Sequence, residues 1–142
     1  MPSFTQRIQN LDQVGPVIEV ILTASPAYLL ANNIAPSETK GIKALAMVDT
    51  GASSTVISQG LAARLKINPV GTTQINTPSS TNVSCHQFDI RIIFPNNINI
   101  HSIIITEAPL QGQHIQCLIG RDVLKHGVLI YTGYDNSFTL SF

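Results

Sequence analysis

The residues of this chain that are best suited to chemistry form one short segment, Asp49-Thr50-Gly51-Ala52. Apolar residues precede the aspartate and a β-rich run follows the segment, so Asp49 stands where a strand ends and a turn begins. A strand end of this kind holds a carboxylate rigidly at the surface of a cleft. Gly51 has no Cβ, which lets backbone approach the carboxylate or a ligand closely, and the small Ala52 leaves the space in front open. The segment therefore indicates a fixed and accessible carboxylate.

A second segment, Leu118-Ile119-Gly120-Arg121, lies much further along the chain. It ends a short apolar strand, and residues 122–126 after it can form one helical turn. Together, the two segments resemble the retropepsins, the short retroviral-type aspartic proteases, and their relatives in cellular genomes. The order of the elements between them also resembles that family, over residues 15–142.

The resemblance implies a role for each residue of the second segment. Leu118 and Ile119 would pack behind the active-site loop, Gly120 would allow a close approach of two backbones, and Arg121 would brace the loop. Many retroviral members have an aspartate facing that arginine, and Ser53 stands in its place here. A hydrogen bond is therefore expected instead of an ion pair. The loop residues that would support the catalytic Asp49 are Thr50, Gly51, Ala52 and Ser53.

A flap over the cleft and a terminal strand at the dimer contact are further features that the resemblance implies. The flap is expected as the hairpin 70–88 with its tip at 77–82. The last strand, within 137–142, resembles the strand that retroviral members donate to the dimer, but a preceding hairpin lets it pair inside its own subunit. The flap residues expected to meet substrate are Thr77, Pro78, Ser79, Ser80 and Thr81.

The elements that must position these residues are mostly strands. Alternation of apolar and polar residues is clearest where Phe88, Ile90, Ile92 and Phe94 share one face, and residues 98, 100 and 104 are assigned to one face of the next strand. Residues 1–14 are a loose arm or an edge strand, and 26–41 connects two strands. Strands are expected over 17–22, 42–48, 55–58, 70–76, 83–94, 98–106, 114–119, 128–131 and 137–142, and short helices over 58–66 and 122–126.

This pattern predicts a single domain over 1–142 with a mainly β fold. By resemblance, the fold is a retropepsin-like closed β-barrel with a flap hairpin and one or two short helices. The 142 residues are 44% hydrophobic and 11% charged, which is typical of a chain with one packed core.

The charge and the N-terminal sequence limit the kinds of partner and the cellular location that we expect for this chain. Eight basic and eight acidic residues cancel, and the basic ones are scattered, so binding to nucleic acid or to an anionic membrane is not expected. No signal peptide and no apolar stretch long enough to span a bilayer is recognised, so a cytoplasmic location is expected.

The chemistry of aspartic proteases requires two carboxylates that share one proton. One deprotonates a water molecule while the other protonates or polarises the scissile carbonyl. This chain has one Asp-Thr-Gly segment, so the second carboxylate must come from another subunit. The expected enzyme is a symmetric homodimer that cleaves extended, apolar-rich polypeptides. The resemblance implies that Thr50 of each subunit reaches across to the other loop. No cofactor, metal or covalent intermediate is implied.

Other readings of the sequence compete with this one. The same fold could serve as a weak or inactive dimerisation or peptide-binding module. Nucleotide chemistry is disfavoured, because the chain is short and lacks alternating helices and strands. The pairs Cys85-His86 and His114/Cys117 could suggest zinc or a Cys-His nucleophile. On strands, however, neighbours and residues three apart face opposite sides, so neither pair converges.

Overall fold

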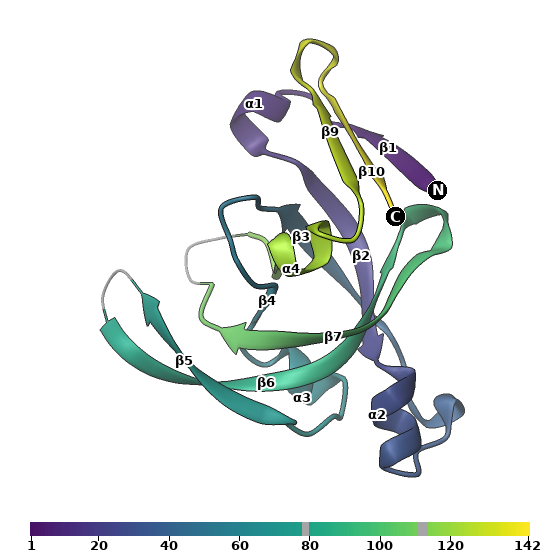
Figure 1. The fold of residues 1–142 in the computed structure, drawn as a ribbon, viewed down its shortest axis with the longest axis vertical. Coiled ribbons are helices and arrows are strands. Elements are labelled where there is room, and N and C mark those ends of the chain that lie inside the picture. The colour runs from purple at the N-terminus through teal and green to yellow at the C-terminus, as the bar shows by residue number, and fades with distance from the viewer. Residues whose placement is uncertain (78–79, 111–113) are drawn as a thin grey trace.

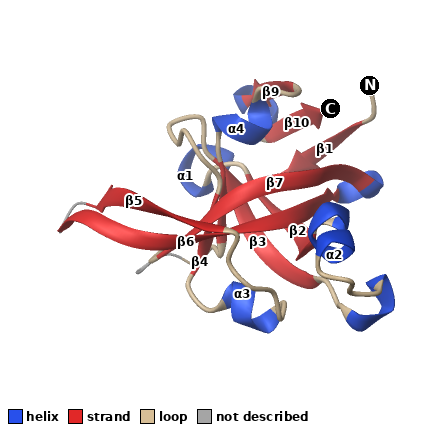
Figure 2. Ribbon diagram, turned by 60° about the horizontal axis from the view of Figure 1, so that its bottom comes forward, coloured by secondary structure: helices blue, strands red, loops and turns tan. Residues whose placement is uncertain are grey.

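A computed structural model describes residues 1–77, 80–110 and 114–142 and shows a mainly β protein (Figure 1). Its short α-helices lie around the strands (Figure 2). The strands are β1 (Ser3–Arg7), β2 (Val17–Ala24), β3 (Ile42–Val48), β4 (Val56–Ser58), β5 (Gly71–Thr77), β6 (Ser80–Phe94), β7 (Ile98–Ala108), β8 (Cys117–Ile119), β9 (Val128–Thr132) and β10 (Ser137–Ser141). The α-helices are α1 (Leu11–Val14), α2 (Pro26–Ala31), α3 (Leu61–Arg64) and α4 (Arg121–Leu124), and 3₁₀ turns cover Pro36–Glu38, Pro95–Asn97 and Gly133–Asp135.

Six strands close into a barrel. Their order is β2-β3-β8-β4-β7-β6, and β6 pairs back with β2. The pairs β3–β8 and β4–β7 are parallel, and the others are antiparallel. Among the described strands, β5 pairs with β6 alone and forms with it the long hairpin that extends away from the barrel (Figure 2). The predicted fold class, a closed β-barrel with a flap hairpin, is confirmed.

The barrel core follows from the alternation along β6. Phe88, Ile90, Ile92 and Phe94 are all buried, as predicted. They pack with fully buried residues of other barrel strands, including Leu22 of β2 and Ile57 of β4. Burial of this many large apolar side chains supplies the main favourable term in folding.

The predicted face of β7 is wrong beyond its first half. Ile104 was expected on the same face as Ile98 and Ile100, but it is 46% exposed, while Ile105 is fully buried. The reason is an irregularity in the β6–β7 ladder, where Ile90 pairs with Ile103 but Ile92 pairs with Ile100. The extra residue in β7 turns the side chains that follow to the opposite face of the strand.

A second, three-stranded sheet has the order β1-β10-β9. Of the two alternatives for residues 1–14, the structure contains the edge strand β1 followed by α1. β10 pairs with β9 and β1 of its own chain, as the preceding hairpin suggested. Phe94 joins this sheet to the barrel by stacking on Phe4 and Phe142, at centroid distances of 5.9 and 5.4 Å.

The connection from β2 to β3 contains α2, which sequence reasoning missed. The signal was present, because Ser25 precedes Pro26, and serine at the N-cap followed by proline is a typical helix start. The Ser25 hydroxyl accepts a hydrogen bond from the Tyr28 N–H at 3.0 Å. Within the described residues, no helix has the length and apolar character needed to cross a membrane.

Candidate active site

Asp49 directly follows the last residue of β3, where the sequence placed it. Its N–H donates to the Ile119 carbonyl at 2.9 Å, which extends the parallel β3–β8 pairing by one step. Its own carbonyl accepts from the Ala52 N–H at 3.2 Å and closes a tight turn. Asp49 is half-buried and Thr50 is exposed. The barrel therefore fixes the backbone of the aspartate and leaves the turn at the surface.

The carboxylate of Asp49 is oriented by its own loop. Oδ1 accepts from the Gly51 N–H at 2.9 Å. A Cβ on Gly51 would lie 3.1 Å from that oxygen, so glycine lets the amide come this close. Among the residues that the structure describes, no other hydrogen bond reaches this carboxylate. Oδ2 thus remains available to a water molecule, a substrate or a second carboxylate.

Gly120 permits the close contact that the family resemblance implied for it. A Cβ built on Gly120 would lie 2.6 Å from the Ser54 carbonyl carbon and 2.7 Å from its oxygen. The next residue, Arg121, donates its N–H to the Ala52 carbonyl at 2.9 Å. Ile119, just before, is fully buried, and Leu118 is half-buried. The end of β8 therefore lies directly against the chain that leaves the Asp49 turn.

Arg121 contacts the loop, but not through the residue expected from the resemblance. Its Nη1 donates to the Thr50 carbonyl at 2.8 Å. The partner is thus the main chain of the loop, whereas the sequence suggested a hydrogen bond at Ser53. A guanidinium that donates to the backbone carbonyl of the residue after Asp49 fixes the turn.

Sequence reasoning missed a part-buried polar contact between Thr55 and Asp122. The Thr55 hydroxyl donates to Asp122 Oδ1 at 2.7 Å and accepts from the Gly120 N–H at 3.0 Å, and the Thr55 N–H donates to Asp122 Oδ2 at 2.9 Å. Thr55 is fully buried. The sequence does hold a signal for this contact, because a buried hydroxyl between a polar loop and a strand requires a hydrogen-bond partner. Asp122 had been assigned only to the first helical turn.

Replacement of Thr55 by valine is expected to destabilise the folded chain by about 2 kcal/mol. Valine keeps the shape but leaves the Gly120 N–H without its acceptor and removes one hydrogen bond from Asp122. Urea unfolding at fixed protein concentration measures the loss. Thr55→Ser keeps the hydroxyl and is the matched control. Thr55→Val as stable as the wild type would show that the hydroxyl contributes nothing.

The comparisons with known proteins identify the family. The gag-polyprotein putative aspartyl protease family matches residues 36–126, which is well over half of the chain and includes both the Asp49 and the Gly120 segments. The chain belongs to this family. No curated protein sequence matches it.

Solved structures agree with an aspartyl-protease fold. A retropepsin-like aspartic protease from Rickettsia conorii is similar with a TM-score of 0.54 at 14% identity, over 98% of this chain and 92% of that one. The retroviral protease-like domain of Ddi1 from Leishmania major is similar with a TM-score of 0.50 at 14% identity, over 89% of each chain. At these identities, the similarity concerns the fold.

The flap of this aspartyl protease fold is the β5–β6 hairpin. Its strands pair regularly from Gly71 with Gln87 to Ile75 with Val83, and then the register shifts. Asn82, which has a φ of 54°, donates its N–H to the Asn76 side chain at 3.1 Å near this shift. Of the predicted substrate-contacting residues, Thr77 and Ser80 are opposite each other, Thr81 is exposed in β6, and Pro78 and Ser79 lie outside the described residues.

The two cysteines of the aspartyl protease fold are free and buried. Burial, with a smaller contribution from the negative charge of Asp122, raises the pKa of the Cys117 thiol to about 12. This thiol is therefore protonated at neutral pH and is a poor nucleophile. In the described part of the chain, no three His, Cys, Asp or Glu side chains come together as a metal site.

Proposed function

We propose that the chain is an aspartic endopeptidase that is active as a homodimer with one Asp49 from each subunit. The observation that supports this most strongly is the accessible Asp49 carboxylate, which Gly51 orients and the barrel fixes. One carboxylate cannot serve as both base and acid in a single step, so a second copy has to supply the other. In such a dimer, one Asp49 activates the water and the other protonates the scissile carbonyl oxygen.

The proposed substrate is an extended, apolar-rich segment of a polypeptide. The β5–β6 hairpin extends away from the barrel, and two such hairpins in a dimer would cover the cleft between the subunits (Figure 2). An extended peptide between the hairpins and the Asp49 loops would form main-chain hydrogen bonds with them. Its side chains would alternate into pockets on either side.

The dependence of cleavage on protein concentration tests the dimer. Cleavage of an unfolded protein should be measured from acidic to neutral pH, beside sedimentation of the same samples. At concentrations where the chain is mostly monomeric, the initial rate should rise with the square of the protein concentration. A strictly linear rise over monomeric samples would contradict the shared site. A folded dimer without cleavage at any pH would favour a binding module on the same fold.

The edge of the three-stranded sheet is the proposed contact between subunits. In the described chain, β9 pairs with β10 on one side and with no strand on the other. Val128 and Ile130 of β9 are 47% and 53% exposed. Their side chains lie on one face of the sheet, and the buried Phe138 and Leu140 of β10 lie on the other face. An apolar edge of this kind is a ready partner for the same edge in a second copy.

Ile130→Glu is expected to weaken the dimer at least about tenfold, because two like charges would meet across the two-fold axis. Cleavage should fall at low protein concentration and return as the concentration is raised. Sedimentation equilibrium and initial rates measure both effects. Ile130→Val keeps an apolar side chain and should behave as the wild type. An unchanged dimer in Ile130→Glu would exclude this edge as the contact.

A further inference from the structure

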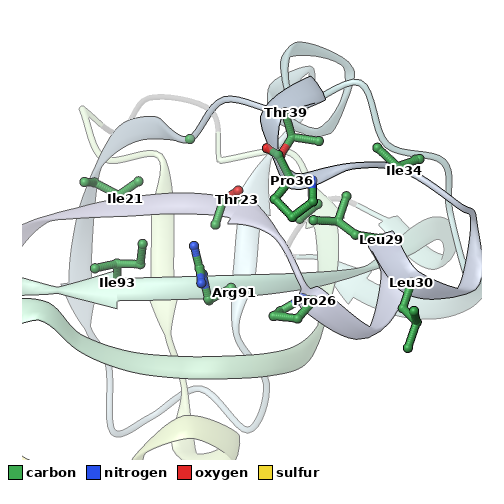
Figure 3. A pocket seen from close by; sticks show the side chains of 12 residues that line it. Ile21, Thr23, Pro26, Leu29, Leu30, Ile34, Pro36, Thr39, Arg91 and Ile93 are labelled. Atoms are coloured by element: carbon green, nitrogen blue, oxygen red, sulfur yellow. The ribbon is translucent and has the colours of Figure 1, made fainter.

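A cavity of about 530 Å³ lies on the outer face of the barrel, between the β2–β6 pair and the connection that contains α2 (Figure 3). Its volume is within the range of small-molecule sites in proteins. The cavity lies next to the first residues of β3, whereas Asp49 follows the last residue of the same strand. A seven-residue strand separates them by about 20 Å. The cavity is therefore separate from the candidate active site.

The floor of the cavity is set by the register of β2 and β6. Ile21 is opposite Ile93, and Thr23 is opposite Arg91. Leu22, which lies between Ile21 and Thr23 along β2, points into the barrel and is fully buried. The four floor side chains consequently share the outer face of the sheet, as Figure 3 shows.

The walls of the cavity are aliphatic and come from the connection between β2 and β3. Leu29 of α2, Ile34 and the ring of Pro36 line this side of the cavity (Figure 3). The Ser25 cap fixes the start of α2 above β2, and the Ile34 N–H donates to the Leu29 carbonyl at 2.9 Å. The connection is thus an ordered wall that encloses apolar space.

Arg91 is the one charged residue among those that line the cavity. Its side chain rises from β6 between Ile93 and Pro26, with its nitrogen atoms toward Thr23 (Figure 3). The Nε atom is buried and has no hydrogen-bond partner among the described residues, and no described carboxylate forms an ion pair with this guanidinium. Because this guanidinium has no anionic partner among the described residues, a ligand that brings an anionic oxygen is favoured here.

The remaining polar groups of the lining are few. The Thr39 hydroxyl already donates to the Pro36 carbonyl at 3.2 Å, which leaves the Thr23 hydroxyl beside Arg91. A peptide would bring several amide groups that need partners, and an aliphatic wall provides none. The lining fits a ligand with one anionic end and an aliphatic body.

We propose that this cavity binds an alkyl carboxylate. The carboxylate would pair with Arg91 and accept from Thr23, and the alkyl chain would lie between Leu29, Ile34 and Ile93. Binding would involve no bond making or breaking. The pairing would give the Arg91 guanidinium an anionic partner, and the alkyl chain would remove apolar side chains from water.

Calorimetric titration of the full chain with octanoate tests the proposal, beside 1-octanol and octylamine as matched probes of the same chain length. Octanoate should bind at least about tenfold more tightly than either, because only it pairs with Arg91. Hexanoate, decanoate and dodecanoate then define the chain length that the cavity accepts. Failure of all four carboxylates to bind, or octanol binding as tightly as octanoate, would overturn the proposal.

Arg91→Met removes the charge and keeps a long unbranched side chain. It should lose at least about tenfold in octanoate affinity and keep its affinity for octanol. Arg64→Met, at an exposed position on α3, is the matched control and should bind octanoate as the wild type does. Retained octanoate affinity in Arg91→Met would contradict the assigned pairing.

Methyl chemical shifts in the wild-type chain locate the ligand without any variant. Octanoate should shift the methyl signals of Leu29, Ile34 and Ile93 and leave those of Ile57 in the barrel unchanged. Shifts confined to other methyls would overturn the proposal. Tighter binding of a short peptide that ends in isoleucine would assign the cavity to a peptide carboxyl terminus instead.

Discussion

Replacement of Asp49 by asparagine is expected to reduce peptide-bond cleavage by at least about 10⁴-fold and to leave the fold intact. In a homodimer, the substitution removes both carboxylates at once, so neither a base for the water nor an acid for the carbonyl remains. The fold should persist because asparagine has the same shape and can still accept from the Gly51 N–H. A cleavage assay on an unfolded protein measures the loss, and far-ultraviolet circular dichroism checks the fold.

Three controls distinguish the loss of the catalytic carboxylate from a loss of correctly folded protein. Asp12→Asn changes an exposed aspartate on α1 in the same way and should cleave as the wild type does. An excess of Asp49→Asn added to wild-type chain should suppress cleavage, because mixed dimers have only one carboxylate. A pepstatin-type inhibitor should block the wild type. Full activity in purified Asp49→Asn would refute the assignment of Asp49.

The parts of the fold that could be predicted from sequence are those with a strong local signal. The alternation along β6 is regular over its whole apolar half, and each predicted inward residue is buried. Asp49 was found because it ends an apolar strand and small residues follow it, whereas Gly120 was found through the family resemblance. Their mutual placement rests on β8 lying between β3 and β4, which no local pattern predicts and which entered through the family resemblance.

The parts that could not be predicted depend on contacts between distant segments. The irregularity in β7 that buries Ile105 arises from its pairing with β6, and the apolar run 103–105 looks the same in either register. The pairing of Thr55 with Asp122 joins residues that are far apart in sequence and becomes visible only when β4 and α4 are placed together. The Arg121 partner is a backbone carbonyl, and side-chain patterns contain no information about it.

Gly120→Ala is expected to destabilise the fold by about 3 kcal/mol, the largest stability effect proposed for a single methyl group in this chain. Backbone conformation is not the cause, because Gly120 has φ −92° and ψ −176°, which alanine adopts readily. The cause is steric, since the new Cβ would lie 2.6 and 2.7 Å from the carbonyl carbon and oxygen of Ser54. Backbone atoms cannot swing away as a side chain can, so β8 and the segment that follows the Asp49 turn must separate.

The separation of β8 from the segment that follows the Asp49 turn should affect the active site as well as the stability of the fold. It would lengthen the hydrogen bond from the Arg121 N–H to the Ala52 carbonyl and so loosen the turn that holds Asp49. Urea unfolding at fixed concentration measures the stability, and the cleavage rate of the fraction that remains folded measures the site. Gly71→Ala is the matched control, because its Cβ would meet only the flexible end of the Gln87 side chain at 3.3 Å, and a change within about 0.5 kcal/mol is expected. If Gly120→Ala were as stable and as active as Gly71→Ala, the contact with Ser54 would not be what positions the Asp49 loop.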